Sequence, residues 1–216
     1  MKHLAEIFNF SNQPADLVVA VGTAAAYPPD VSINGSVIIG TKVFLHSCHP
    51  NGSNPDSKWD CGPFDTIISS PLNKIDFDTM TSIETNPPSV MDRFLVPPLN
   101  PDPKGGRLIA DYDNVALNTI NVTDYSEYSK MDKMTLTAFH ERFNPEYGKS
   151  IETTHGLIRI AAGFSTPYLF ISGIVDREGY FQEDVVPRSY AQNTSGAHNA
   201  GIIIAWMLPK INKIFS

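Results

Sequence analysis

The chain has 216 residues, of which 42% are hydrophobic and 18% are charged, and this composition is typical of a single α/β domain. The net charge of −7 at pH 7 argues against nonspecific binding of nucleic acid, because such binding needs a basic surface. Two cysteines are too few for a disulfide framework.

Neither end of the sequence predicts a targeting or membrane segment. The start, MKHLAEIFNF, lacks the long apolar core and the small-residue cleavage site of a signal peptide. The longest apolar stretch, GIIIAWMLP near the end, is far too short to span a membrane. We therefore expect a soluble cytoplasmic protein without a membrane partner.

Two apolar segments in the first part of the chain predict buried strands, after a short helix at residues 2–10. Residues 15–26, ADLVVAVGTAAA, form a continuous apolar run that ends in small residues, as in strands buried on both faces. Residues 36–47, SVIIGTKVFLHS, predict a second long strand that begins after a turn at Gly35.

Turn-forming residues divide the middle of the chain. Residues 49–63 predict a surface loop, and the Pro-rich residues 84–105 predict an irregular excursion or lid. Residues 107–114 and 115–124 predict two adjoining strands, with a turn at Asp113-Asn114.

The last third of the chain predicts a helix, a strand and a second helix. Apolar residues recur at helical spacing over residues 150–162, and Gly163 ends this predicted helix. Residues 167–175, PYLFISGIV, predict a buried strand, and residues 187–208 predict a final helix that Pro209 ends.

Together these elements predict a three-layer α/β sandwich, in which helices flank a central mixed sheet. No internal repeat is visible, so we expect residues 1–216 to form one domain.

Two blocks of the sequence resemble the nucleoside phosphorylase and nucleosidase superfamily, whose members cleave the N-glycosidic bond of nucleosides. Residues 17–47 resemble the family's strand, its Gly-Ser/Thr-Ala-Gly loop and the strand that follows. Residues 151–208 resemble its ribose-binding helix, its strand ending in Ser-Asp and its closing helix. The resemblance implies a phosphorylase-like fold. The family begins with a further strand and a Gly-rich turn that this sequence does not show. The alternatives are an N-terminally incomplete or processed chain, parts supplied from elsewhere, or a member that lacks them.

Asp176 occupies the position of the family's catalytic Asp, nine residues after Pro167, while Val175 stands where Ser is common. The resemblance implies that Asp176 protonates the leaving base of a purine-type nucleoside. An Asp has an ordinary pKa near ~3.9, so burial would have to raise it for proton donation near neutral pH. The alternative is a carboxylate that only caps the turn after the strand.

The resemblance places Gly22, Thr23 and Ala24 on a loop that contacts base, ribose or phosphate. The same small residues also suit a tight turn between a strand and a helix. Ala20 stands where phosphorylases often hold a phosphate-binding Arg, which favours hydrolysis over phosphorolysis. Inorganic phosphate remains a possible co-substrate, and no cofactor is expected.

Glu152 and Thr154 fall where the family has its ribose-binding Glu. The alternative for Glu152 is an N-terminal capping box, with Ser150 followed by Thr153, or a carboxylate in the first helical turn that favours the helix dipole. We expect His155 to be a half-buried histidine whose hydrogen bonds are satisfied within the protein, and not a ligand-binding residue. Tyr125 is a candidate for stacking on the base, with packing in a core or lid as its alternative.

Zinc-competent residue types occur at His46, Cys48, His49 and Cys61, but their spacing fits no common zinc pattern, so we expect no metal site.

The sequence therefore predicts an enzyme that cleaves purine-type nucleosides or nucleotides by hydrolysis or phosphorolysis. The alternative is a noncatalytic relative that binds such molecules in a regulatory or storage role. The resemblance also implies a homo-oligomer. Polar residues of the last predicted helix are expected to cover the mouth of the site, to form an oligomer contact or to face solvent; they are Arg188, Gln192, Asn193, His198 and Asn199.

Overall fold

The structure is a computed structural model that describes residues 15–46, 48–50, 59–61, 66–82, 90–98, 106–119, 148–152 and 154–216. Its main element is an eight-stranded mixed sheet with the strand order β6-β3-β8-β9-β1-β10-β2-β7. The strands of this sheet are β1 (Val18–Ala26), β2 (Val37–Gly40), β3 (Lys42–His46), β6 (Thr66–Ser69), β7 (Leu108–Ala110), β8 (Val115–Thr119), β9 (Gly148–Glu152) and β10 (Tyr168–Arg177).

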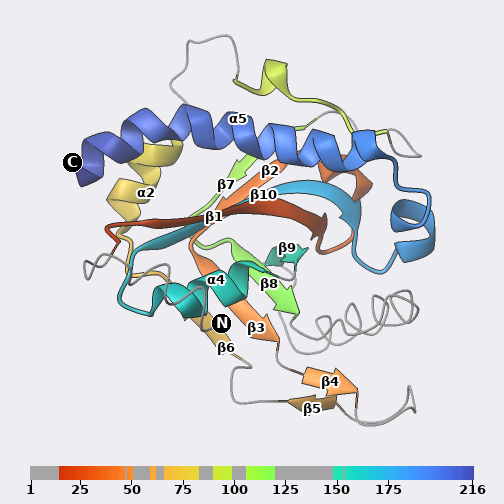
Figure 1. Ribbon diagram of the computed structural model, residues 1–216, viewed down its shortest axis with the longest axis horizontal. Helices are drawn as coiled ribbons and strands as arrows, with labels where there is room; N and C mark the ends of the chain where they lie inside the picture. The colour runs from red at the N-terminus through yellow and green to blue at the C-terminus, as the bar shows by residue number, and fades with distance from the viewer. Residues whose placement is uncertain are drawn as a thin grey trace.

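Helices cover both faces of the sheet (Figure 1). The long helix α5 (Tyr190–Phe215) lies along one face, with α2 (Lys74–Thr81) beside its C-terminal half. Helix α4 (His155–Ala162) lies on the other face and contacts β1, β3 and β8. The predicted three-layer α/β sandwich with a mixed central sheet is therefore confirmed.

Strands β1 and β10 form the centre of the fold. They run parallel, from Val18 opposite Tyr168 to Ala26 opposite Arg177, with an irregularity in register between Ala24 and Ala25. Nine of the ten β10 residues are buried, because both faces of the strand lie beneath helices. β10 is therefore buried on both faces, as its apolar run predicts. The same prediction was wrong for β1, because Val21 and Thr23 on one of its faces are exposed.

The predicted strand over residues 36–47 is two strands in the structure. β2 pairs with β10 and β7, whereas β3 pairs with β6 and β8, so the chain enters a different part of the sheet after Thr41. The Thr41 hydroxyl donates to the Tyr112 carbonyl at 2.7 Å. A continuous apolar run cannot show this change of partners, because β2 and the centre of β3 are both buried.

The prediction of one helix over residues 150–162 was wrong at its start. Residues up to Glu152 form β9, where Ser150 and Ile151 pair with both β1 and β8. α4 begins only at His155, and it ends at Gly163, where a φ of 79° favours glycine, as predicted.

The final helix was also predicted too short. α5 begins at Tyr190, where the Ser189 side chain caps Gln192, and continues through Pro209 to Phe215. Proline removes one helical hydrogen bond, so the sequence argument placed an end there. The residues after it, Ile211, Ile214 and Phe215, pack against the apolar core beneath α5, which stabilises the extra turns.

The predicted loop at residues 49–63 contains parts of a two-stranded sheet, in which β4 (Cys48–Pro50) pairs with β5 (Trp59–Cys61). The predicted excursion over residues 84–105 contains a short 3₁₀ helix, η2 (Val90–Arg93). The predicted turn at Asp113-Asn114 is present, and the Asp111 carboxylate accepts from the Asp113 amide at 2.9 Å.

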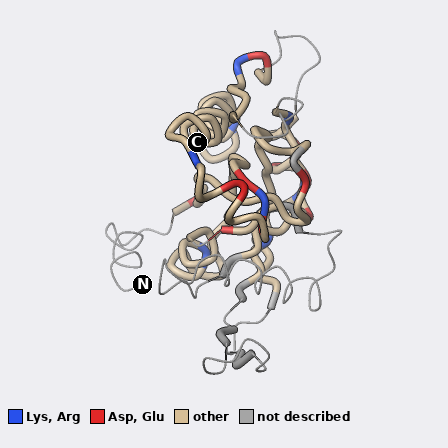
Figure 2. The backbone as a smooth tube through the Cα atoms, turned by 90° about the vertical axis from the view of Figure 1, so that its right-hand side faces the viewer, with Lys and Arg blue, Asp and Glu red and all other residues tan. Residues whose placement is uncertain are grey.

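Lys and Arg positions are interspersed with Asp and Glu positions along the described backbone (Figure 2). In the part of the chain that the structure describes, no helix is both long enough and apolar enough to cross a bilayer.

Candidate functional site

The carboxyl ends of β1 and β10 bring the first candidate residue into place. Asp176 lies at the end of β10 opposite Ala25, immediately after the irregularity in the β1–β10 register. It is 5% exposed. Ligands of open α/β sheets commonly bind at the carboxyl ends of parallel strands, so this is a favourable position for a functional carboxylate.

Asp176 forms an ion pair with Arg188, which precedes helix α5. Burial of a carboxyl group favours its neutral form, whereas a neighbouring guanidinium favours the carboxylate. The structure therefore supplies the burial that the sequence argument required, and it adds a cation with the opposite effect.

A hydrogen-bond network fixes the segment that carries Arg188. The Gln192 amide donates to the carbonyl of Val175 at 2.7 Å and to that of Asp184 at 2.9 Å. Arg177 binds the Asp184 carboxylate through two nitrogens, at 2.8 and 2.7 Å. This network joins η4 (Phe181–Val185), a π-helix, and the start of α5 to the end of β10 beside Asp176.

Gly22, Thr23 and Ala24 lie within β1, so the expectation that they form a loop was wrong. They pair with Ser172, Gly173 and Ile174 of β10, because the parallel register continues to Ala26. The Thr23 side chain is exposed and Ala24 is buried. Gly22 lies against His155, whose Nε2 would be 3.2 Å from a Cβ at that position.

Glu152 is a buried carboxylate at the start of α4. It accepts hydrogen bonds from the Thr154 amide, from the Thr154 hydroxyl at 2.9 Å and from the His155 amide at 2.7 Å. These contacts satisfy backbone donors that a helix leaves free in its first turn. Glu152 therefore caps α4 from the end of β9, and the alternative that placed it within the first helical turn was wrong. A ribose contact of Glu152 or Thr154 stays a prediction.

His155 is 1% exposed, so it is more deeply buried than the sequence argument expected. Its Nδ1 lies 3.4 Å from the Ser172 hydroxyl and 3.7 Å from Oε1 of Glu152. Burial lowers the pKa of His155, and the Glu152 carboxylate opposes this effect. The cluster beneath Gly22 thus contains a neutral imidazole held by polar neighbours.

The other predicted positions give less information. Tyr125 lies outside the described residues. The β4–β5 pairing sets Cys48 opposite Cys61 in register. Among the described residues, no group of three His, Cys, Asp or Glu side chains could hold a metal ion.

Sequence reasoning named Arg188, Gln192 and Asn199 only as polar residues of a packed helix. The structure shows Asn199 fully buried, donating to the Gly35 and Leu95 carbonyls at 2.8 Å and accepting from the Leu95 amide. A polar side chain on a helix that must pack closely against a sheet is the signal that could have identified such contacts.

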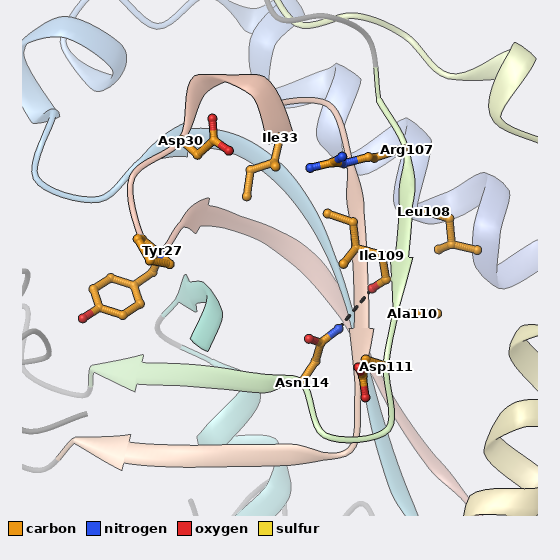
Figure 3. A pocket seen from close by; sticks show the side chains of 10 residues that line it. Tyr27, Asp30, Ile33, Arg107, Leu108, Ile109, Ala110, Asp111 and Asn114 are labelled. Atoms are coloured by element: carbon orange, nitrogen blue, oxygen red, sulfur yellow. Dashed lines mark hydrogen bonds between the residues drawn. The ribbon is translucent and has the colours of Figure 1, made fainter. Parts of the chain in front are cut away.

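A separate pocket of about 540 Å³ lies beside η1 (Val31–Ile33), β7 and the β7–β8 turn (Figure 3). Asp176, Glu152 and the Gly22–Ala24 segment do not line it. The candidate residues at the strand ends and this pocket are therefore distinct places.

Comparison of the sequence with models of known protein families gave no match, and comparison with curated proteins gave none either. Solved structures do match the fold. One is a 5′-methylthioadenosine/S-adenosylhomocysteine nucleosidase from Colwellia psychrerythraea 34H in complex with adenine. It has a TM-score of 0.58 and 12% identity, over 97% of this chain and 72% of that chain.

Two further nucleosidases of the same kind give similar results. The Neisseria meningitidis structure, in complex with methylthio-immucillin-A, has a TM-score of 0.53 and 16% identity, over 95% of this chain and 73% of that chain. The Helicobacter pylori structure has a TM-score of 0.54 and 12% identity, over 96% of this chain and 74% of that chain.

These observations define the class of fold: it is the α/β fold that the matching nucleosidase structures share. Within it, the structural neighbours are 5′-methylthioadenosine/S-adenosylhomocysteine nucleosidases. The resemblance read from the sequence is confirmed at the level of the fold.

Proposed function

We propose that the protein cleaves the N-glycosidic bond of a purine-type nucleoside or nucleotide, with Asp176 as the general acid. The observation that carries this proposal is a buried carboxylate at the carboxyl end of β10, in a fold shared with nucleosidases. The structures from C. psychrerythraea and N. meningitidis contain adenine and a methylthio-immucillin, which supports a purine-type substrate.

The chemistry suits a carboxylic acid at this position. Cleavage of a glycosidic bond proceeds through an oxocarbenium-like sugar, and the leaving group departs more easily when it is protonated. In the proposed step, Asp176 donates its proton to N7 of the purine while the bond between the base and C1′ breaks. The electron pair of that bond goes to the base. Phosphate then adds to C1′, or water adds and releases a proton, which restores the acid form of Asp176.

Arg188 has a defined place in this proposal. Its guanidinium stabilises the negative charge that Asp176 acquires after it has given up the proton, because opposite charges attract strongly in a buried site. The Gln192 and Asp184 contacts hold the segment of Arg188 in position, so the pair can act without a large rearrangement.

Hydrolysis is the favoured reaction. Ala20 is a buried residue of β1 and supplies no cation for phosphate. Inorganic phosphate is still included as a candidate co-substrate, since a phosphate ligand can come from another part of a protein. Homo-oligomer formation, which the family resemblance implies, and a cytoplasmic location belong to the same proposal.

The test is to incubate the purified protein with adenosine, inosine, methylthioadenosine and S-adenosylhomocysteine, each with and without phosphate, and to measure the released base by chromatography. Release without phosphate supports hydrolysis, and release only with phosphate supports phosphorolysis. No release from any of these compounds by the folded protein contradicts the proposal.

A noncatalytic nucleoside-binding relative is the second candidate. The position of Glu152 favours it, because three hydrogen bonds from the start of α4 already occupy the carboxylate expected to bind ribose. Calorimetric titration with the same compounds separates the two. Saturable binding without turnover supports the second candidate, and turnover excludes it.

A further inference from the structure

The pocket beside β7 has an apolar wall that no helix covers within the described structure. Helix α4 covers β1, β3 and β8 on this face. Ile33 and Ile109 belong to the apolar cluster under α4, and both also line the pocket. Its volume of about 540 Å³ lies within the range of about 300–1,000 Å³ that small-molecule sites occupy.

Arg107 supplies a cation at this wall. Its guanidinium extends toward Ile33 and above Ile109 (Figure 3). The Arg107 backbone amide donates to the Ser36 hydroxyl at 3.2 Å, but the guanidinium has no hydrogen-bond or ion-pair partner among the described residues. A free guanidinium presents several N–H donors in a planar fork, which suits an acceptor edge of a flat ligand.

Asn114 supplies a fixed acceptor. It is 4% exposed, and its amide nitrogen donates to the carbonyls of Ile39 at 2.9 Å and Ile109 at 3.2 Å. Because both partners are carbonyl oxygens, the nitrogen must face them, and Oδ1 points away from Ile109 (Figure 3). Within the described chain, Oδ1 has no hydrogen-bond donor.

Gly40 explains why Asn114 can occupy this place. A Cβ at Gly40 would lie 2.4 Å from the Asn114 carbonyl oxygen and 2.6 Å from its Cβ. Position 40 of β2 therefore has to be glycine, because a side chain there would overlap Asn114. Without one, the Asn114 amide can lie between β2 and β7.

Two carboxylates, those of Asp30 and Asp111, lie at opposite ends of the pocket (Figure 3). Asp30 accepts from the amide and the hydroxyl of Ser32, both at 2.8 Å. With one guanidinium and two carboxylates, the lining has a net negative charge. An anionic ligand is therefore disfavoured, and an uncharged ligand with both acceptors and donors is favoured.

The geometry points to a second ligand site in this pocket, separate from Asp176, that takes a planar, uncharged oxopurine base. The ring would lie against Ile33 and Ile109. The oxygen and ring nitrogen of its acceptor edge would face Arg107, which is the pairing by which arginine reads the O6 and N7 atoms of guanine. An N–H on its other edge would donate to Oδ1 of Asn114.

The experiment uses hypoxanthine as the probe and the full chain labelled with ¹⁵N. Titration followed by two-dimensional NMR should move the amide signals of residues 108–111 in a saturable way. Arg107→Gln should weaken hypoxanthine binding roughly 5-fold or more, and Arg107→Lys should also weaken it, since lysine keeps the charge but loses the planar fork. Arg107 is exposed, so these variants are expected to fold.

The matched control is Arg93→Gln, at an exposed arginine on η2 that does not line the pocket. It should bind hypoxanthine as tightly as the wild type does. Asp176→Asn should likewise give the wild-type affinity when binding is followed through the amide signals of residues 108–111. Adenine, which carries an amino donor in place of the oxygen, should bind this pocket more weakly.

Three results would overturn the inference: no saturable shift at residues 108–111, equal affinity of Arg107→Gln and the wild type, or equal affinity for adenine and hypoxanthine. The amide signals near Asp176 are observed separately from those of residues 108–111. Absence of binding in the pocket would therefore not contradict the proposed glycosidic activity, which the base-release assay tests.

Discussion

At the scale of single residues, Arg159 connects the C-terminal end of α4 to the segments packed around it. It is fully buried, and its guanidinium lies 5.4 Å from the centre of the Tyr168 ring. Its two terminal nitrogens donate, at 2.9–3.1 Å, to the carbonyls of Gly163, Thr166, Ser69 and Phe164. One side chain thus closes the C-terminal end of α4 and fixes the residues that lead into β10.

We expect Arg159→Met to lower the free energy of unfolding by about 2–4 kcal/mol, because methionine fills similar space but removes the four hydrogen bonds that the guanidinium donates. Urea denaturation followed by circular dichroism measures the change. Arg93→Met, at an exposed position, should stay within about 0.5 kcal/mol of the wild type. Equal stability of the two variants would contradict the structural role of Arg159.

His155 should make the stability of the protein depend on pH. Burial lowers its folded-state pKa below the ordinary value of 6.5, so the unfolded chain binds a proton more readily than the folded one. The stabilising contribution is therefore present above about pH 6.5 and is lost as the pH falls through the lower folded-state pKa.

Unfolding free energies measured between pH 8 and pH 5 test this expectation. The wild type should lose stability over this interval, and His155→Gln should lose less. His198→Gln removes an exposed histidine and should leave the slope of the wild type unchanged. A slope that His155→Gln does not alter would show that His155 is not the group responsible.

At the scale of elements, the close approach of α5 to β10 depends on two glycines. A Cβ at Gly173 would lie 2.0 Å from the carbonyl oxygen of Gly196, and a Cβ at Gly196 would lie 2.2 Å from Cγ1 of Val175. No Cβ fits at such distances without movement of the helix.

Gly173→Ala should therefore lower the unfolding free energy by about 2 kcal/mol or more, because the backbone of α5 must move away from β10. Gly201→Ala is the matched control. Nothing lies within 4 Å of a Cβ at Gly201, so alanine should stabilise the same helix by roughly 0.5–1 kcal/mol. Thermal unfolding of both variants checks the opposite signs, and a neutral Gly173→Ala would contradict the close packing.

The elements that the sequence predicted best are those with one simple environment. β10 is buried on both faces, so a continuous apolar run identifies it. The start of α4 was missed because Ile151 suits a buried strand and a helical face equally well. Its pairing with Ala25 in β1 decides the outcome, and sequence spacing does not show this contact.

At the scale of the whole molecule, the order of the apolar elements was enough to predict a layered α/β fold. The candidate site was predictable only in part. Asp176 stands out because a charged residue ends an apolar strand. Its ion pair with Arg188 depends on how η4 returns the chain to the sheet, and nothing in the local sequence specifies that path.

The central claim is that Asp176 supplies the proton for the departing base. The most direct measurement compares the rate of base release by the wild type with that of Asp176→Asn, on whichever nucleoside the panel shows to be cleaved. Asp92→Asn, at an exposed position on η2, is the control. Circular dichroism of all three proteins establishes that each is folded.

The account predicts that Asp176→Asn lowers the rate about 100-fold or more, because an amide cannot donate an acidic proton to the base. Asp92→Asn should retain the wild-type rate. A folded Asp176→Asn protein that releases base as fast as the wild type would contradict the account.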